Sequence, residues 1–289
     1  MNLICSEHIK NIMPQRPADA NKYSVGSLLC VCGSTGFAGA AALCAKAALR
    51  AGAGLVRCAV PRSIYPIVAT LVPEAVFLVL EETEDGAISQ KETSKIIKAA
   101  KKCDAVVLGC GSKLCKDTES IAMSLCMECE TPLLLDADGI NALSKHINVL
   151  KEAKCPLVLT PHEGEMSRLT GVASSKIRAN RKKTASEFAD EYHCVLVLKG
   201  KDTLVASKDR DTLVNTTGNA GMAVAGSGDV LSGMIGAFMA QGVKPFEAAQ
   251  IGVFLHGLAG DNAKDNLGEL SVIPSDIIEC IPCAIKSIM

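Results

Sequence analysis

Residues 219–233 contain the side chains and spacing best suited to chemistry. Their centre is Gly226-Ser227-Gly228-Asp229, and an apolar run that predicts a buried helix follows at once. Glycines around a small hydroxyl residue let backbone N–H groups point at one spot. The start of a helix adds unpaired N–H groups and the positive end of a dipole. This pattern indicates an anion hole, and phosphate is its commonest ligand.

Asp229 is unexpected in such a loop, because a carboxylate repels phosphate by up to about a few kcal/mol when it is partly desolvated. We therefore expect Asp229 to face the group that attacks the phosphate, where it could accept a proton from a substrate hydroxyl. An anion hole with a base is the minimum for phosphoryl transfer to an alcohol. The alternative is that Asp229 only caps the helix, since Asp is favoured there and short glycine motifs are weak signals.

Lys199-Gly200 follows another predicted strand, and Thr203 stands three residues later. A cation, an unhindered backbone and a hydroxyl at a strand end are suited to holding a nucleotide. The alternative is the polar start of a hairpin. The rule that ligands lie at the carboxyl ends of parallel strands favours nucleotide binding.

Further polar residues follow other predicted strands. Asp136 and Asp138 could bind Mg²⁺ through water, or Asp138 could cap a helix over 140–143. His162 could contact a ligand or exchange a proton near neutral pH, or it could start a helix over 164–169. The glycine-rich turn over 33–39 lacks the Lys-Ser/Thr ending of a P-loop, so it either holds a substrate group or only turns the chain.

The elements that must position these residues alternate along the chain. Strands are predicted over 27–32, 55–60, 75–80, 105–108, 133–135, 157–159 and 194–198, with a hairpin over 203–206 and 212–214. Helices are predicted near the N-terminus and over 41–51, 93–102, 118–129, 175–192, 230–240, 245–264 and from 274 to the end.

Short, continuously apolar strands alternating with helices are typical of a parallel sheet covered on both faces. We predict one domain over residues 1–289, of α/β class, with three α/β/α layers and a mainly parallel central sheet. A TIM barrel is the second choice, because the hairpin and the consecutive C-terminal helices break its rhythm. The special residues fall at strand ends, so we expect one large cleft along one edge of the sheet.

Composition excludes several classes of function. The net charge of -1 offers no basic field for nucleic acid, and a short basic cluster over 178–183 is interpreted as a solvated helix face. No export signal is evident and no apolar run reaches the ~18 residues of a membrane span, so a cytoplasmic protein is expected. The 14 cysteines are interpreted as reduced thiols in the core, and no metal ligand is assigned with confidence.

The motifs, taken in order, resemble the ADP- or ATP-dependent NAD(P)H-hydrate dehydratases of the ribokinase-like superfamily. The resemblance covers about residues 10–285. Besides the segments 219–223 and 226–233, it rests on Gly39-Ala-Ala, the run over 47–56, Leu135-Asp-Ala-Asp-Gly-Ile-Asn, Thr160-Pro-His-Glu-Gly-Glu and Lys199-Gly.

This resemblance implies a hydro-lyase that repairs the S-form of hydrated NADH and NADPH. A nucleotide would phosphorylate the ring hydroxyl, and elimination of phosphate would then restore the double bond. Asp229 would be the catalytic base, with Gly226, Ser227 and Gly228 forming the anion hole. The implied nucleotide-binding residues are Lys199, Gly200, Lys201, Asp202, Thr203, Asn219 and Gly228. The implied substrate-binding residues are Ala40, Gly111, Asp138, His162 and Asp229.

The sequence departs from the family pattern in three places. Phe37 stands where the family often has Tyr. Gly109-Cys-Gly-Ser-Lys replaces the usual Gly-Pro-Gly-Leu-Gly, and Val224-Ala-Gly replaces Thr-Gly-Gly. The Gly-Ser-Gly-Asp core is kept.

The resemblance also implies Mg²⁺, ADP or ATP as phosphoryl donor, a homotetramer and a separate NAD(P)H-hydrate epimerase as functional partner. Two other hypotheses remain. One is a ribokinase-like kinase of small vitamin-precursor alcohols, which would release a stable phosphorylated product. The other is a nucleotide-binding regulatory protein without turnover.

Overall fold

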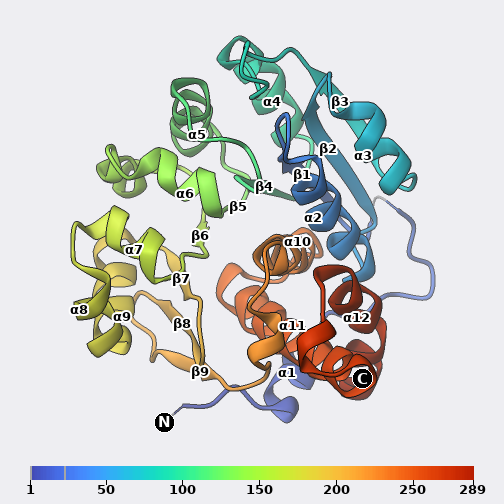
Figure 1. Cartoon of the computed structure of the whole chain (residues 1–289), viewed down its shortest axis with the longest axis vertical. Coiled ribbons are helices and arrows are strands. Elements are labelled where there is room, and N and C mark those ends of the chain that lie inside the picture. Colours follow the sequence, from blue (N-terminus) through green and yellow to red (C-terminus); the bar gives the residue numbers. More distant parts are fainter. Residues whose placement is uncertain (1, 23) are drawn as a thin grey trace.

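A nine-stranded sheet forms the centre of the protein, in the order β3-β2-β1-β4-β5-β6-β7-β8-β9. The computed structural model describes residues 2–22 and 24–289. Helices cover both faces of the sheet (Figure 1), so the predicted three-layer α/β/α architecture is confirmed. The strands are β1 Ser27–Val31, β2 Leu55–Pro61, β3 Val76–Leu80, β4 Ala105–Leu108, β5 Leu133–Leu135, β6 Leu157–Leu159, β7 Val195–Leu198, β8 Thr203–Ser207 and β9 Leu213–Asn215.

Strands β1 to β7 pair in parallel, whereas β8 and β9 are antiparallel to their neighbours. The mainly parallel sheet and its terminal hairpin are therefore as the sequence predicts. The α-helices are α1 Ser6–Ile12, α2 Ala38–Arg50, α3 Tyr65–Leu71, α4 Thr93–Ala100, α5 Lys116–Glu128, α6 Ala137–Leu143, α7 Glu163–Thr170, α8 Ser174–Ala179, α9 Arg181–Tyr192, α10 Ser227–Ala240, α11 Pro245–Leu267 and α12 Pro274–Ile288. Short 3₁₀ turns are η1 Gln90–Glu92, η2 Ile147–Glu152, η3 Ala220–Met222 and η4 Glu269–Ser271.

Alternation along the strands divides the core between the two faces. On β1, Leu28 and Cys30 face the layer of α2, α10, α11 and α12, and Leu29 and Val31 face the layer of α4 to α9. Successive side chains of a strand point to opposite faces, so a fully buried strand must be apolar throughout. The two apolar clusters explain why β4, β5, β6 and β7 contain no polar residue.

Three boundaries differ from the predictions. The helix predicted over 175–192 is two helices, α8 and α9, because Asn180 adopts a non-helical conformation and donates a side-chain hydrogen bond to the carbonyl of Lys176. Helix α3 was not predicted. Helix α6 begins at Ala137, so Asp138 lies in its first turn and the prediction that Asp138 caps it is wrong.

The described residues include no helix long and apolar enough to cross a membrane. The cysteines are free thiols and most of them are buried, which agrees with their interpretation as small core residues.

Two glycines allow α10 to pack closely on its neighbours. A Cβ atom at Gly233 would lie 2.1 Å from the carbonyl oxygen of Cys44 in α2, and one at Gly236 would lie 2.5 Å from a methyl of Val107 in β4. Both distances are far below van der Waals contact, so only glycine fits without a shift of the backbone or of the strand. Helix α10 is thereby fixed between α2 and the sheet.

We expect Gly233→Ala to lower the free energy of unfolding by about 1–3 kcal/mol, because the added methyl overpacks the α2–α10 contact. Urea unfolding of the parent and the variant measures the difference. Gly39→Ala is the matched control, since a Cβ at this helical glycine meets nothing within 4 Å. Equal stability of both variants and the parent would contradict the close-packing argument.

Candidate functional site

The start of α10 forms one wall of the candidate site. Gly226 precedes the helix with φ of +98°, and a Cβ there would lie 2.7 Å from Leu43. Both the positive φ and the close contact favour glycine at this position. The first i→i−4 bond runs from Val230 N to Gly226 O at 3.2 Å. The N–H groups of Gly228 and Asp229 precede that bond and have no hydrogen-bond partner within the described chain. They form the part of the predicted anion hole that is open to a ligand.

Ser227 is less open to an anion than predicted. Its N–H donates to Val224 O at 3.3 Å, and its hydroxyl contacts Nε2 of His256 in α11 at 3.3 Å. Burial lowers the pKa of His256 to about 4, so this ring is neutral near pH 7. His256 is thus a buried core histidine whose ring pairs with the Ser227 hydroxyl.

Asp229 is the third residue of α10, and Gly226 occupies the N-cap position. The alternative in which Asp229 caps the helix is therefore wrong. Burial and the negative charge of Asp136 raise the pKa of Asp229 to about 7. An oxygen of each carboxylate and the sulfur of Cys110 lie within 4.8 Å of one another. The site thus holds a carboxylate that changes charge near neutral pH.

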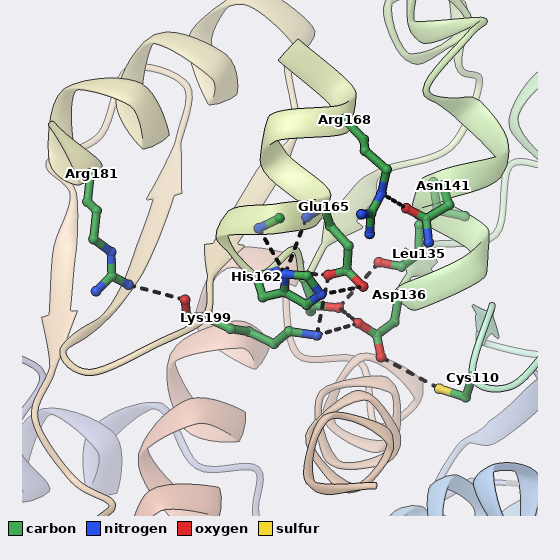
Figure 2. Close-up of polar contacts among 11 residues, drawn as sticks. Cys110, Leu135, Asp136, Asn141, His162, Glu165, Arg168, Arg181 and Lys199 are labelled. Atoms are coloured by element: carbon green, nitrogen blue, oxygen red, sulfur yellow. Dashed lines mark hydrogen bonds and ion pairs between the residues drawn. The ribbon is translucent and has the colours of Figure 1, made fainter. Parts of the chain in front are cut away.

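Lys199, at the end of β7, lies between two buried carboxylates (Figure 2). Its ammonium is 2.8 Å from Oδ1 of Asp136 and 3.8 Å from Oε2 of Glu165. Thr160 also donates its hydroxyl proton to Asp136, at 2.7 Å. Burial opposes the charge of Lys199, but the two carboxylates outweigh burial and raise its pKa, so the side chain is an ammonium. We refer to Asp136, Thr160, Glu165 and Lys199 as the buried ion network.

Gly228 brings this network against the start of α10. A Cβ atom on Gly228 would lie 3.3 Å from Nζ of Lys199 and 3.8 Å from Oδ2 of Asp136. An anion at the Gly228 N–H therefore lies close to the ammonium. The structure joins the predicted anion hole, the predicted base and the predicted cation in one place.

His162 serves the start of α7. Its Nδ1 accepts the N–H groups of Gly164 at 2.9 Å and Glu165 at 3.3 Å, while Glu165 accepts the N–H of His162 at 2.8 Å. This reciprocal pair is a capping box. Because Nδ1 accepts, the neutral ring carries its proton on Nε2, and the side chain is half exposed. Nε2 lies 3.4 Å from Oε1 of Glu165, so both ring nitrogens face partners at the start of α7.

The predicted substrate residues Ala40 and Gly111 are neighbours. A Cβ on Gly111, which has φ of +64°, would lie 2.8 Å from the Cβ atoms of both Ala40 and Phe37. Asp138 accepts the N–H of Lys113 at 2.9 Å and so ties this loop to α6. Phe37 is 55% exposed at the rim. These residues form a wall beside the buried ion network, and the hydrogen bond from Lys113 to Asp138 holds the loop after β4 in place.

The predicted nucleotide-binding segment turns around Arg181, which was interpreted as part of a solvated helix face. That interpretation is wrong, because its side chain is only 18% exposed. Its guanidinium donates to the carbonyls of Leu198 at 3.0 Å and Lys199 at 3.3 Å, and also to that of Lys201. The hydroxyl of Thr203 donates to Gly200 O at 2.9 Å and closes the turn.

A surface cavity of about 290 Å³ lies beside this turn. It is lined by Leu3, Arg181, Lys182, Lys201, Asp202, Leu204, Val214 and Thr216. The cavity combines three cationic side chains and one carboxylate with apolar walls, and no residue of the buried ion network lines it.

Asn219 has a structural task in the loop before α10. Its amide donates to Gly260 O and to Asp261 Oδ1, both at 3.0 Å, and its Oδ1 accepts Gly221 N at 3.0 Å. The loop is thereby fixed to α11. In this arrangement Asn219 positions the anion hole, because its side-chain groups are already paired.

Glu165, Thr160 and Cys110 are site residues that the sequence did not single out for a role. Glu165 and Thr160 lie in the segment flagged around His162, so their strand-end position was the available signal. Cys110 stands in the departure from the family pattern, and its thiol donates to Asp136 at 3.8 Å.

The predicted Mg²⁺ site at Asp136 and Asp138 does not form a cage of free oxygens. Asp136 Oδ1 already accepts from Lys199 and Thr160, and Asp138 Oδ2 accepts from Lys113. Mg²⁺ is usually held by substrate phosphates with only one or two carboxylates. The side chains therefore do not define a preformed magnesium site.

Comparisons with known proteins agree with this arrangement. Residues 28–283 match the NAD(P)H-hydrate dehydratase family. A bifunctional NAD(P)H-hydrate repair enzyme of Moorella thermoacetica is 39% identical over 286 residues, which cover 99% of this chain and 54% of that protein. An ADP-dependent (S)-NAD(P)H-hydrate dehydratase of Neisseria meningitidis is 36% identical over 262 residues, covering 89% of this chain and 84% of that protein. The chain thus spans about half the length of its bifunctional relatives.

The fold is similar to that of solved members. The ADP/ATP-dependent NAD(P)H-hydrate dehydratase from Bacillus subtilis, co-crystallised with ATP and Mg²⁺, superposes with a TM-score of 0.86 at 27% identity. The match covers 100% of this chain and 99% of that one. With a three-layer α/β/α fold of the ribokinase-like type, a glycine-rich loop before α10 and these relatives, the chain belongs to the NAD(P)H-hydrate dehydratase family.

Proposed function

We propose that this protein is an ADP-dependent (S)-NAD(P)H-hydrate dehydratase. The observation that carries the proposal is the placement of Asp229, a base with a pKa of about 7, beside two open N–H groups and the Lys199 ammonium. Relatives named for this activity support the choice of substrate and of ADP. A hydrated nicotinamide ring offers the hydroxyl that such a base can deprotonate.

The chemistry follows from the charges in the site. Asp229 accepts the hydroxyl proton as the oxygen attacks the terminal phosphorus of the nucleotide. The N–H groups of Gly228 and Asp229 and the ammonium of Lys199 stabilise the charge on the transferring phosphoryl group. Phosphate is a better leaving group than hydroxide, so the C–O bond breaks, a ring proton is lost and the double bond returns.

The remaining roles are assigned from position. Ala40, Gly111 and the half-exposed side chain of His162 would line the dinucleotide pocket. Residues 199–203 and the cavity beside Arg181 would hold the adenine nucleotide. The nucleotide would bring Mg²⁺ on its phosphates, and no step above requires a protein ligand for the ion.

We further infer that residues 1–289 act as one domain in a cytoplasmic homotetramer and work with a separate epimerase. The bifunctional relatives support the epimerase link, because they are named for the whole repair of NAD(P)H hydrates. Analytical ultracentrifugation tests the tetramer.

The first test is recovery of reduced-nicotinamide absorbance from hydrated NADH with Mg²⁺ and either ADP or ATP. Recovery that requires ADP, with release of inorganic phosphate, is the expected result. Recovery with ATP but not with ADP would identify ATP as the phosphoryl donor. A stable phosphorylated alcohol in place of free phosphate would point to the alternative, a small-alcohol kinase. The absence of any reaction with either nucleotide would favour the other hypothesis, a nucleotide-binding regulatory protein.

We expect Asp229→Asn to lower turnover by about a hundredfold or more, because the general base is lost. Nucleotide binding should persist, since the N–H groups remain in place. The coupled absorbance assay and calorimetric titration with ADP measure the two effects. Exposed Asp265 in α11 provides the control Asp265→Asn, which should leave turnover unchanged. Full turnover in Asp229→Asn would remove this residue from the mechanism.

We expect kcat/KM to rise with pH up to about 7 and then level off, because Asp229 must be ionised to act as a base. Asp136→Asn removes a negative neighbour that raises the pKa of Asp229, so the acidic limb should move to lower pH. The pH dependence of kcat/KM, measured for the parent and for Asp136→Asn, gives the position of the acidic limb in each protein. A limb that stays in place or moves to higher pH would show that Asp136 does not tune the base.

A further inference from the structure

Four buried thiols gather between β1, α2 and the loop after β4. Cys30 lies in β1 and Cys32 directly follows that strand, and both side chains are in the apolar cluster that includes Cys44 of α2. Cys110 follows β4, the other neighbour of β1. The exposed fraction of each of these side chains is 1% or less. None of them has a role in the chemistry proposed above.

Three of the thiols meet at one point. The sulfurs of Cys32, Cys44 and Cys110 all lie within 4.8 Å of one another, and Cys44 is also 3.9 Å from Cys30. Zn–S bonds of about 2.3 Å in a tetrahedral site separate the sulfurs by about 3.8 Å. Each sulfur therefore needs to move by less than about 1 Å to share an ion. The β1–α2–β4 framework already brings the three groups together.

The surroundings of this cluster differ from those of an ordinary apolar core. The thiol of Cys110 donates to Asp136 at 3.8 Å, and Asp136 is held by the ammonium of Lys199 at 2.8 Å. Through Cys110 the cluster therefore contacts the buried ion network. The ammonium of Lys199 offers a positive charge that balances an anionic complex.

The thiols are protonated before an ion arrives. Hydrogen bonding to Cys110 and burial raise the pKa of Cys44 well above its ordinary value, and hydrogen bonding to Cys32 and burial do the same for Cys110. Binding must then exchange protons for metal. A divalent ion forms three metal–sulfur bonds, three S–H bonds break, three protons leave to solvent, and the complex carries one negative charge.

We propose that Cys32, Cys44 and Cys110 form a binding site for a thiophilic divalent cation of the Zn²⁺ and Cd²⁺ class. The site lies next to the buried ion network, which Cys110 contacts through Asp136. Soft thiolate ligands select such ions over Mg²⁺, so nucleotide-bound Mg²⁺ does not compete for it. The proposal concerns the fold alone and stands whether or not the proposed dehydratase activity is found.

Cadmium titration of the protein, with reducing agent removed under nitrogen, tests the site. The parent for this test carries Cys5→Ser, Cys115→Ser, Cys280→Ser and Cys283→Ser, because these four thiols are not buried and two of them form a Cys-x-x-Cys pair. The ultraviolet thiolate-to-cadmium absorption should saturate at one ion per chain. Cys44→Ala should weaken binding by about a hundredfold or more, since one of three chelating ligands is lost.

Cys126→Ala is the matched control. Cys126 is likewise a buried helical cysteine, but it lies in α5 on the opposite face of the sheet, where it forms a second Cys-x-x-Cys pair with Cys129. The Cys126→Ala variant should bind cadmium with the same affinity as the parent. Equal affinity in Cys44→Ala and the parent, or loss of binding in Cys126→Ala, would overturn the proposal.

A second measurement covers the case in which Cys44→Ala does not fold. X-ray absorption at the cadmium edge counts the sulfur neighbours in the loaded parent and in folded Cys126→Ala. Three sulfurs in both proteins are expected. A shell without sulfur, or one that loses sulfur when Cys126 is replaced, would place the ion elsewhere.

Discussion

The mutual repulsion of buried carboxylates is the constraint on which the site depends. Asp136, Glu165 and Asp229 lie around one ammonium, that of Lys199, in a region largely closed to water. Three negative charges cannot be held there at little cost by one positive charge. Asp136 and Glu165 contact Lys199 directly, so the imbalance falls on Asp229. A perturbed acid next to an anion-binding helix start is typical of a catalytic position.

The parallel sheet is what makes this arrangement possible. Strands β5, β6 and β7 are consecutive neighbours in the sheet, and they are followed directly by Asp136, Thr160 and Lys199, respectively. Strands in a sheet are about 4.8 Å apart, so residues at successive carboxyl ends come within hydrogen-bond reach of one another. Helix α10 then adds Asp229 from the layer beneath. Residues distant in sequence form one network because the strand order places them in a row.

The sequence predicted the parts of the structure that depend on periodicity and strand ends. Apolar runs located the parallel strands within a few residues, and the strand-end rule gathered Asp136, His162 and Lys199 on one edge. Individual side-chain contacts could not be predicted from the sequence. Whether Arg181 faces solvent or folds back onto the carbonyls after β7 is decided by a break at Asn180, and propensity over 175–192 averages across that break. The position of Asp229 within α10 depends on Gly226, whose φ only the folded chain reveals.

The contact of α10 with α2 and β4, where Gly233 and Gly236 exclude every larger side chain, limits how this site could acquire a new specificity. The helix cannot slide or tilt to suit a bulkier substrate without separating two layers of the protein. Its N-terminal end is fixed in position, and adaptation is left to the rim, where Phe37 is more than half exposed. Laboratory evolution toward other alcohols should therefore begin with rim residues and leave the interior of α10 untouched.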